Sequence, residues 1–354
     1  MITLNRGEWS ELYCVLFLLV KPNLTIVDEN LDIISDTVFE INKIIAEMNF
    51  PLEYEIVDGR IVVYVAKGKI KEYSQEEIIA KKNELYDKIS HVASRKGAFA
   101  IESIEEFLKN FSYGQIPKAK SGQKEDIEAL VYDNIVHTQN DIKYSIKSAM
   151  GSPATLLNSS GQTNFKYRIF GMTDSLMKKV NSIKTRTKLK DRLKLLKDSS
   201  CKIEFVGATS SCFSSNLKMI DSLMDKYIAN TLLYSYGSDS KILKNIFIDA
   251  NEFEDEKIAI KKLGDFLLAI SFGFFPGKEW DGENIVNGGI LLVKENGQVV
   301  LLDLIYHSNS VRNYLINNTQ LDSPSSTRYH MLEVYKEDDN YYFTLNLQIR
   351  YIRS

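Results

Sequence analysis

The sequence has little cysteine and histidine and no long run of apolar residues. Its three cysteines, Cys14, Cys201 and Cys212, are odd in number and lack paired spacing, so neither a disulfide framework nor a cysteine zinc site is indicated. Four scattered histidines form no zinc pattern. The apolar run Leu12–Val20 is too short to cross a bilayer, and no basic leader precedes it. We therefore expect a cytoplasmic protein with reduced thiols and no membrane association.

Composition favours a folded protein and leaves DNA binding open. The 354 residues are 44% hydrophobic and 11% aromatic, as in a globular chain. A net charge of −3 disfavours nucleic-acid binding, but the charge is uneven, with ten Lys or Arg and two Asp between residues 178 and 202. This basic run predicts a helix that is either DNA-facing or simply solvated. Its candidate phosphate contacts are Lys184, Arg186 and Lys188.

Residues 126–147 carry the strongest chemical pattern of the chain. Two apolar runs predict a hairpin, and side chains alternate between the faces of a strand. Asp126 and Glu128 then share one face of the first strand, and Ser145 and Lys147 share one face of the second. Carboxylates beside a lysine suit Mg²⁺-dependent phosphodiester hydrolysis, because Mg²⁺ prefers oxygen ligands and a lysine can offset charge on the phosphate. The alternative is an ordinary hairpin with a solvated acidic end and a surface lysine.

The segments on either side of Lys147 fit contacts with nucleic acid. Lys118, Lys120 and Lys124 precede the first strand, and residues 148–165 are rich in Ser, Thr, Asn, Gln and Gly. Short amides and hydroxyls can bind phosphates and base edges. Asn158 and Asn164 are the candidates here, although such a composition also occurs in ordinary loops.

Several segments in order along the chain resemble the HpaII-type restriction endonucleases, a branch of the PD-(D/E)XK nuclease superfamily. They span residues 5 to 350 and include Asn5–Tyr13, Tyr144–Ser148 with Gly151–Asn158, Trp280–Gly282, Gly288-Gly289, Ser323–Arg328 and Leu345–Arg350. The resemblance implies an α+β fold, with a mixed β-sheet core of the PD-(D/E)XK type flanked by helices and an added C-terminal α/β recognition part. It also makes Ser145, in the position of the second acid, a trait of the family.

Because a serine cannot supply a carboxylate, the metal needs an acid from elsewhere. Related nucleases carry a glutamate on the helix that packs against this sheet, so Glu11 is our first candidate and Glu8 the second. Glu128 is a further source. The alternative for Glu11 is a solvated acid in a first helical turn. The predicted metal ligands for Mg²⁺ are therefore Asp126, Glu11, Glu8 and Glu128, and the predicted catalytic residues are Asp126, Lys147, Ser145 and Glu11.

The resemblance implies a type II restriction endonuclease that hydrolyses both strands of a short duplex DNA site, with CCGG as the site it points to. We expect 5′-phosphate and 3′-hydroxyl ends, a homodimer on palindromic DNA, and a DNA methyltransferase that protects the same site. Ser325, Ser326, Thr327 and Arg328 are the candidate base-reading residues, since Arg can pair bidentately with guanine. The alternatives are a DNA-binding protein whose nuclease site has decayed and a repair or recombination nuclease of the same superfamily.

The periodicity predicts the order of elements and a division of labour. Helices are expected from near Arg6 and over 37–48, 75–93, 101–110, 178–202, 215–233 and 256–272, and hairpins about 58–59, 296–297 and 338–340. No linker separates domains. We predict a helical N-terminal segment and catalytic core over residues 1–172 and a DNA-recognition part over residues 173–354.

Overall fold

The structure is a computed structural model that divides into two compact units. The described residues are 2–47, 51–65, 68–92, 97–116 and 123–352. Unit 1 comprises the described residues of Met1–Ala154 and Asn284–Tyr314, and unit 2 comprises Thr155–Glu283 and Leu315–Ile352. The chain therefore leaves unit 1 after Ala154 and returns to it at Asn284.

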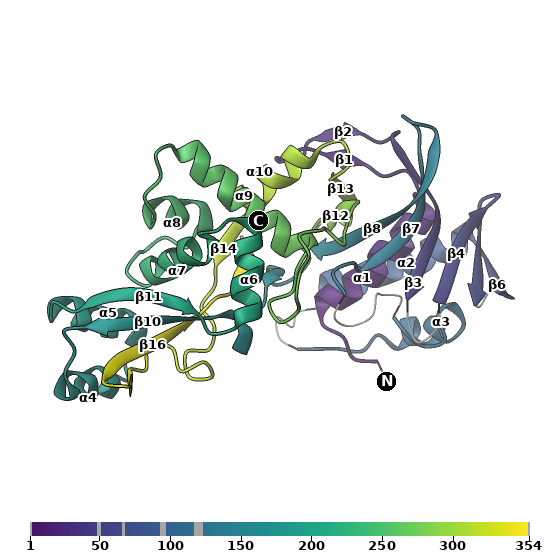
Figure 1. Cartoon of the computed structure of the whole chain (residues 1–354). Helices are drawn as coiled ribbons and strands as arrows, with labels where there is room; N and C mark the ends of the chain where they lie inside the picture. The colour runs from purple at the N-terminus through teal and green to yellow at the C-terminus, as the bar shows by residue number, and fades with distance from the viewer. Residues whose placement is uncertain (1, 48–50, 66–67, 93–96, 117–122, 353–354) are drawn as a thin grey trace. The chain divides into compact units, whose positions relative to one another are not determined.

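A ten-stranded mixed sheet forms the frame of unit 1 (Figure 1). Its strands are, in spatial order, β2 (Ile33–Ser35), β1 (Ile26–Val27), β13 (Val299–Asp303), β12 (Gly289–Val293), β8 (Thr138–Ser148), β7 (Ile127–Asp133), β3 (Phe39–Glu47), β4 (Pro51–Val57), β5 (Arg60–Val65) and β6 (Gly68–Ser74). The hairpin β7–β8 lies in the middle, and β12, from much later in the chain, pairs with β8 in parallel. The inner strands are thus paired on both sides.

The helices of unit 1 are α1 (Arg6–Val20), α2 (Gln75–His91), α3 (Glu102–Phe111) and the first part of α10 (Ser308–Asn317). Helix α1 belongs to the core, because its buried residues Trp9, Leu12 and Leu16 cluster with Tyr144 and Ile146 of β8. No helix in the described ranges has the length and apolar character needed to cross a membrane.

Unit 2 contains two smaller sheets with helices around them. The four-stranded sheet has the order β11 (Lys202–Ala208), β10 (Asn164–Phe170), β16 (Asn340–Asn346) and β15 (Tyr335–Glu337), and the three-stranded sheet has the order β14 (Thr319–Leu321), β17 (Ile349–Tyr351) and β9 (Thr155–Leu157). The helical segments are η1 (Gly161–Thr163), α4 (Asp174–Ser182), α5 (Lys188–Asp198), α6 (Ser211–Ile220), α7 (Met224–Ser235), α8 (Leu243–Asp249) and α9 (Glu256–Phe272). One face of the larger sheet packs against α6 and α7, where Phe165 contacts Phe213 and Tyr167 Oη donates to Ala229 O at 2.8 Å.

The α+β class is confirmed, but one predicted helix is wrong. Residues 37–48 were expected to be helical, whereas Phe39–Glu47 form strand β3. A bulge lies between Ile41 and Lys43 where β3 pairs with β7, so the buried side chains Ile41 and Ile44 are three residues apart, and this spacing imitates a helical stripe. The predicted basic helix is also divided, because the chain ends α4 at Ser182 and begins α5 at Lys188.

The three predicted hairpins are confirmed, and one turn shows why its glycine is needed. Gly297 in the β12–β13 turn has φ +80, and a Cβ there would lie 2.7 Å from Tyr86 and 2.9 Å from Tyr13 Oη. The Tyr13 hydroxyl donates to Gly297 O at 2.6 Å. The turn therefore docks closely onto the residues of α1 and α2, and only glycine leaves room for this approach.

Candidate active site and DNA-recognition residues

The hairpin β7–β8 places the predicted acids and lysine on one face, as the alternation predicts. Ile127 and Ala129 of β7 and Tyr144 and Ile146 of β8 are buried in the core of unit 1. Glu128, Ser145 and Lys147 therefore lie on the opposite face. Glu128 of β7 lies opposite Lys143 of β8 in the register of the hairpin.

Asp126 lies just before β7 and bonds to the neighbouring strand through backbone and side chain. Its N–H donates to Tyr144 O at 2.8 Å. Its Oδ2 accepts from the backbone N–H of Ile146 at 2.6 Å and from Ser145 Oγ at 3.1 Å, and the Lys147 ammonium lies 3.5 Å away. Within the described part of the chain, these hydrogen bonds of the carboxylate all fall on Oδ2. Asp126 is thereby held rigidly at the edge of the hairpin.

Ser145 is part of this network and is 2% exposed. While donating to Asp126, its hydroxyl accepts a hydrogen bond from Lys147 Nζ at 2.6 Å. Lys147 also donates to Ile146 O at 2.8 Å and stays partly exposed. The serine therefore holds the lysine and the aspartate in one hydrogen-bonded group.

Helix α1 brings Glu11 near this group and gives Glu8 a role of its own. Glu8 completes a capping box, in which Asn5 N donates to Glu8 Oε2 at 2.9 Å and Glu8 N donates to Asn5 Oδ1 at 3.0 Å. Burial raises the pKa of the Cys14 thiol well above its usual value, and the charges of Asp126 and Glu11 raise it further. Cys14 therefore lies within electrostatic reach of both carboxylates.

A second lysine belongs to the same electrostatic environment. The pKa of Lys124 is lowered to about 8, chiefly by burial and also by the charge of Lys147, while the charge of Asp126 partly opposes the shift. Lys124 is thus a neighbour of the Asp126–Lys147 group. Lys118 and Lys120 lie outside the described residues.

No set of three or more His, Cys, Asp or Glu side chains in the described ranges is arranged to hold a metal ion. This does not conflict with a Mg²⁺ site, because Mg²⁺ commonly takes one or two carboxylates and completes its shell with water and substrate phosphate. The atoms of the predicted acids that could bind a cation are carboxylate oxygens, which are the ligands that a hard cation requires.

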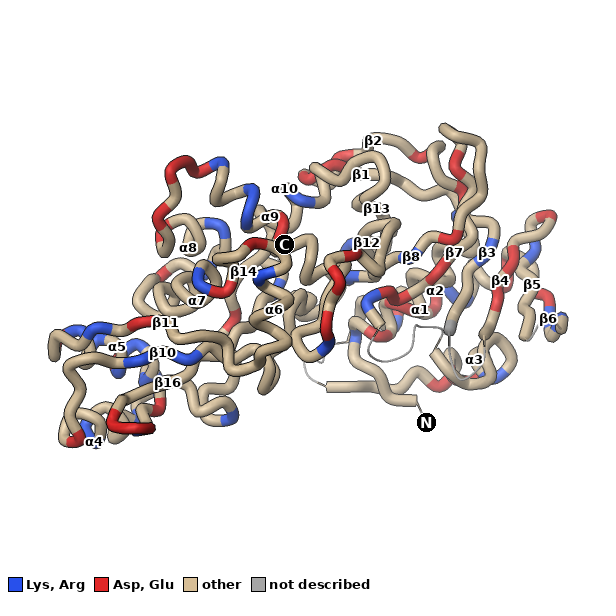
Figure 2. Tube along the Cα trace, viewed as in Figure 1, with Lys and Arg blue, Asp and Glu red and all other residues tan. Residues whose placement is uncertain are grey.

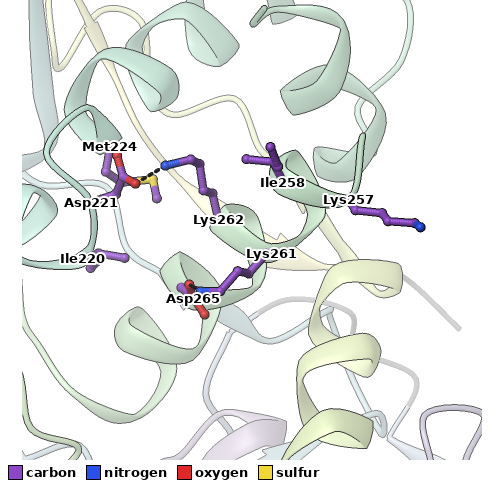
Figure 3. Close-up of a pocket in the computed structure, with 8 residues that line it drawn as sticks. All are labelled: Ile220, Asp221, Met224, Lys257, Ile258, Lys261, Lys262 and Asp265. Carbon is purple, nitrogen blue, oxygen red and sulfur yellow. Dashed lines mark hydrogen bonds and ion pairs between the residues drawn. The ribbon is translucent and has the colours of Figure 1, made fainter. Parts of the chain in front are cut away.

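One pocket of unit 2, of about 480 Å³, is separate from this chemistry (Figure 3). It is lined by Ile220, Asp221, Met224, Lys257, Ile258, Lys261, Lys262 and Asp265. Lys262 pairs with Asp221, and Lys261 pairs with Asp265 at 2.5 Å. These four charges form two ion pairs, and Lys257 is the other charged side chain of the lining.

The basic run is exposed where α4 gives way to α5. Figure 2 shows Lys and Arg gathered along this part of unit 2. Lys184 and Arg186 are exposed in the segment between the helices, and Lys188 opens α5 and is partly exposed. Arg192 is different, because it is 3% exposed and its guanidinium is bonded to backbone carbonyls. The run thus combines exposed cations suited to phosphates with one arginine that serves the fold.

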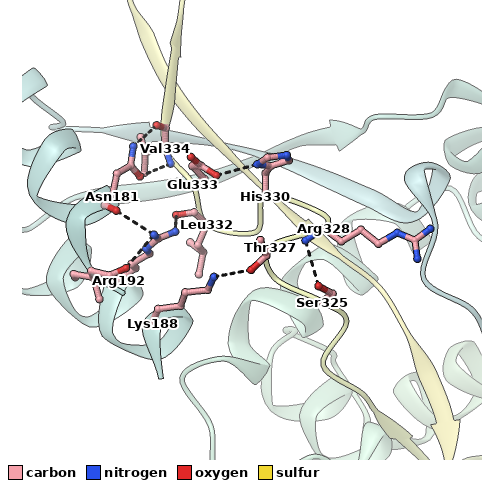
Figure 4. A network of polar contacts seen from close by, with 11 residues as sticks. Asn181, Lys188, Arg192, Ser325, Thr327, Arg328, His330, Leu332, Glu333 and Val334 are labelled. Carbon is pink, nitrogen blue, oxygen red and sulfur yellow. Dashed lines mark hydrogen bonds and ion pairs between the residues drawn. The ribbon is translucent and has the colours of Figure 1, made fainter. Parts of the chain in front are cut away.

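The predicted base-reading segment lies beside this basic run (Figure 4). Lys188 Nζ donates to Thr327 Oγ1 at 3.4 Å, and Arg192 Nη1 donates to Leu332 O at 3.1 Å. Asn181 of α4 exchanges two hydrogen bonds with the backbone of Val334, at 2.7 and 2.9 Å. Residues 325–334 are therefore anchored to α4 and α5 through their backbone, while the Arg328 side chain is exposed.

Of the two asparagines, Asn158 is exposed and Asn164 is engaged within unit 2. Asn164 Nδ2 donates to Gly161 O at 3.3 Å, and its Oδ1 accepts from Asn346 Nδ2 at 2.8 Å. Tyr329 Oη donates to Ser159 O at 3.1 Å, so the loop that carries Asn158 is joined to residues 325–334. The structure thus brings Asn158 and Arg328 into one region and leaves Asn164 little freedom to read a base.

Three buried polar residues of these regions escaped the sequence-based prediction. Glu125 adjoins Asp126, Arg192 lies inside the basic run, and Asn346 bonds to Ser160 O at 2.6 Å and to Asn164. Only the fold distinguishes Glu125 and Arg192 from solvated neighbours of the same type. For Asn346, its apolar surroundings in Leu345-Asn346-Leu347 are a signal that could have indicated burial.

A mixed sheet with a central hairpin that carries an acid, a serine and a lysine is the kind of arrangement nucleases use for phosphodiester hydrolysis. A model of the HpaII restriction endonuclease family matches residues 5–351. The type II restriction enzyme HpaII of Haemophilus parainfluenzae is 30% identical over 362 residues, which cover 98% of each chain. No solved structure matches the chain significantly. The chain belongs to the HpaII restriction endonuclease family, and its enzyme class is that of the type II site-specific deoxyribonucleases.

Proposed function

We propose that this enzyme cleaves both strands of a short, specific duplex DNA site with Mg²⁺ as cofactor, leaving 5′-phosphate and 3′-hydroxyl ends. The observation that carries the proposal is the hydrogen-bonded group of Asp126, Ser145 and Lys147 on one face of the central hairpin. Family membership favours cleavage over the two alternatives, a decayed DNA-binding protein and a nuclease of repair or recombination.

The residues of this group have distinct roles in the proposed reaction. Asp126 Oδ1 and the carboxylate of Glu11 would hold the cation, with Glu8 and Glu128 as the further acidic candidates. A divalent cation supplies Lewis-acid stabilisation of the charge that develops on the phosphate. Lys147 donates a hydrogen bond to the scissile phosphate or the attacking water, and Ser145 positions the ammonium, as their 2.6 Å contact supports.

Recognition is assigned to unit 2. Arg328 and its neighbours Ser325, Ser326 and Thr327 would contact base edges together with Asn158, and Asn164 would support that loop. Lys184, Arg186 and Lys188 would bind phosphates, which supports affinity without sequence preference. The assignment rests on the exposure of Arg328 and of the cations beside it. The predicted functional division into residues 1–172 and 173–354 differs from the division into units, because Asn158 and Asn164 precede residue 173 but belong to unit 2.

We further propose that the enzyme acts in the cytoplasm as a homodimer on a palindromic site, paired with a methyltransferase that modifies the same sequence. CCGG is the first sequence to test, because of the resemblance to HpaII-type enzymes.

Plasmid digestion with Mg²⁺, followed by sequencing of the fragment ends, tests the proposal. We expect a common end sequence and complete inhibition by a chelator. Fragments without a common sequence would refute the specificity, and intact DNA across a range of Mg²⁺ and salt concentrations would refute cleavage.

A further inference from the structure

Glu125 is a buried acid with an incomplete set of partners. The residue is 7% exposed, and its Oε1 accepts from Lys143 Nζ at a long 3.4 Å. Its Oε2 is buried and has no hydrogen-bond partner among the described residues. A buried carboxylate oxygen without a partner is unfavourable, so a native structure that keeps one usually completes it with an ion or a water.

This acid lies beside the Asp126–Lys147 group. Glu125 precedes Asp126 directly in the chain. Its partner Lys143 stands two residues before Ser145 on β8, on the same face as Ser145 and Lys147. The carboxylate of Glu125 is therefore joined to a lysine of the strand face that also carries the proposed catalytic lysine.

Several side chains of the proposed metal site already have hydrogen-bond partners. Ser145 has no carboxylate, and its hydroxyl is already bonded to Asp126 and Lys147. Asp126 Oδ2 accepts from three donors, and Glu8 Oε2 caps α1. Glu125 Oε2 has no such engagement within the described chain.

We propose that Glu125 Oε2 is a ligand of the divalent cation, next to Asp126, and supplies the carboxylate that Ser145 lacks. The inference rests on the proposed function, because it assigns a residue to that metal site. Lys143 holds Oε1 and so fixes the orientation of the carboxylate. Mg²⁺ commonly takes one or two carboxylates with water and a substrate phosphate, so Glu125 would be the second carboxylate beside Asp126 in place of Glu11.

The test measures Mn²⁺ binding to the full-length protein without DNA, from the free-Mn²⁺ signal in electron paramagnetic resonance. Glu125→Gln keeps the size of the side chain and one carbonyl for Lys143, but removes the charge. We expect it to weaken Mn²⁺ binding by about tenfold or more, and to abolish the rise in melting temperature that Mn²⁺ produces. Asp141→Asn, an exposed acid on the same hairpin, is the matched control and should bind Mn²⁺ like the wild type.

Two further variants separate the possible outcomes. If Glu125 serves only as the partner of Lys143, Glu125→Gln and Lys143→Met will lower the melting temperature alike and leave Mn²⁺ affinity unchanged, which overturns the inference. If Asp126→Asn abolishes Mn²⁺ binding while Glu125→Gln keeps it, the inference fails and the proposed metal site stands. If Asp126→Asn also keeps full affinity, the metal site itself is misplaced. Should Glu125→Gln not fold, Glu125→Asp retains the charge but retracts the carboxylate, and an unchanged Mn²⁺ affinity there also overturns the inference.

Discussion

Replacing Arg192 by methionine should destabilise unit 2 by about 3 kcal/mol, as the hydrogen bonds of its guanidinium indicate. Nη1 donates to Leu332 O at 3.1 Å, and Nη2 donates to Asn181 O at 3.2 Å and Ile183 O at 3.1 Å. The bond to Leu332 is buried, and the two at Nη2 are partly buried. Leaving a buried acceptor without a donor costs about 1–3 kcal/mol, and water can partly replace the donor at the other two carbonyls. The full loss at Leu332 O and the two partial losses at Asn181 O and Ile183 O together give the expected destabilisation of about 3 kcal/mol.

The measurement is urea unfolding followed by tryptophan fluorescence. Trp9 belongs to unit 1 and Trp280 to unit 2, so a Trp9→Phe background leaves a reporter for unit 2 alone. Arg192→Lys should give an intermediate loss, because an ammonium lacks the planar fork that spans several carbonyls. Arg186→Met removes an exposed arginine six residues earlier and should stay within about 0.5 kcal/mol of the wild type. Equal stability of Arg192→Met and Arg186→Met would refute the reasoning.

Four other predictions concern catalysis, recognition and the central sheet. Lys147→Ala should abolish cleavage but keep specific DNA binding in gel-shift titrations, because its contribution grows as charge develops in the transition state; loss of binding would contradict this. Arg328→Ala should cost about 1–3 kcal/mol of binding to the specific duplex and little to a scrambled one, and an unchanged site preference would shift the assignment to Asn158. Lys184→Ala should weaken binding to the specific and the scrambled duplex alike and reduce the salt dependence of binding. Weaker binding to the specific duplex alone would indicate a contact with a base. Gly289→Ala should destabilise unit 1 by about 3 kcal/mol or more in urea unfolding, because φ is +114 and the new Cβ would lie 2.1 Å from Leu302 O; a loss below about 1 kcal/mol would show that β12 can move aside.

Local patterns were enough to predict the central hairpin and its polar face. The alternation from Asp126 to Lys147 depends only on the two-residue period of a strand, and the structure has that alternation in β7 and β8. The turns of the three hairpins are likewise determined by residues that are close together in the sequence. Features whose cause lies within one strand or turn can be deduced from neighbouring residues alone.

Contacts between segments far apart in the sequence decide which strands pair with that hairpin in the sheet. A hairpin about residues 296–297 was expected, but nothing local indicated that β12 would pair with β8. The bulge in β3 likewise depends on its partner β7, and without that partner the spacing of Ile41 and Ile44 favours a helix. Pairing between strands is a property of two segments, so one segment read alone does not contain it.

Which charged residues are buried also depends on contacts between distant segments. Glu125 and Glu128 are both acids at the start of one predicted strand, and Arg186 and Arg192 are both arginines in one basic run. Glu125 and Arg192 become buried because other elements cover them and supply Lys143 and three backbone carbonyls as partners. The sequence determines which charges are present, and the tertiary structure determines which of them lose water, since desolvation depends on everything that packs around a group.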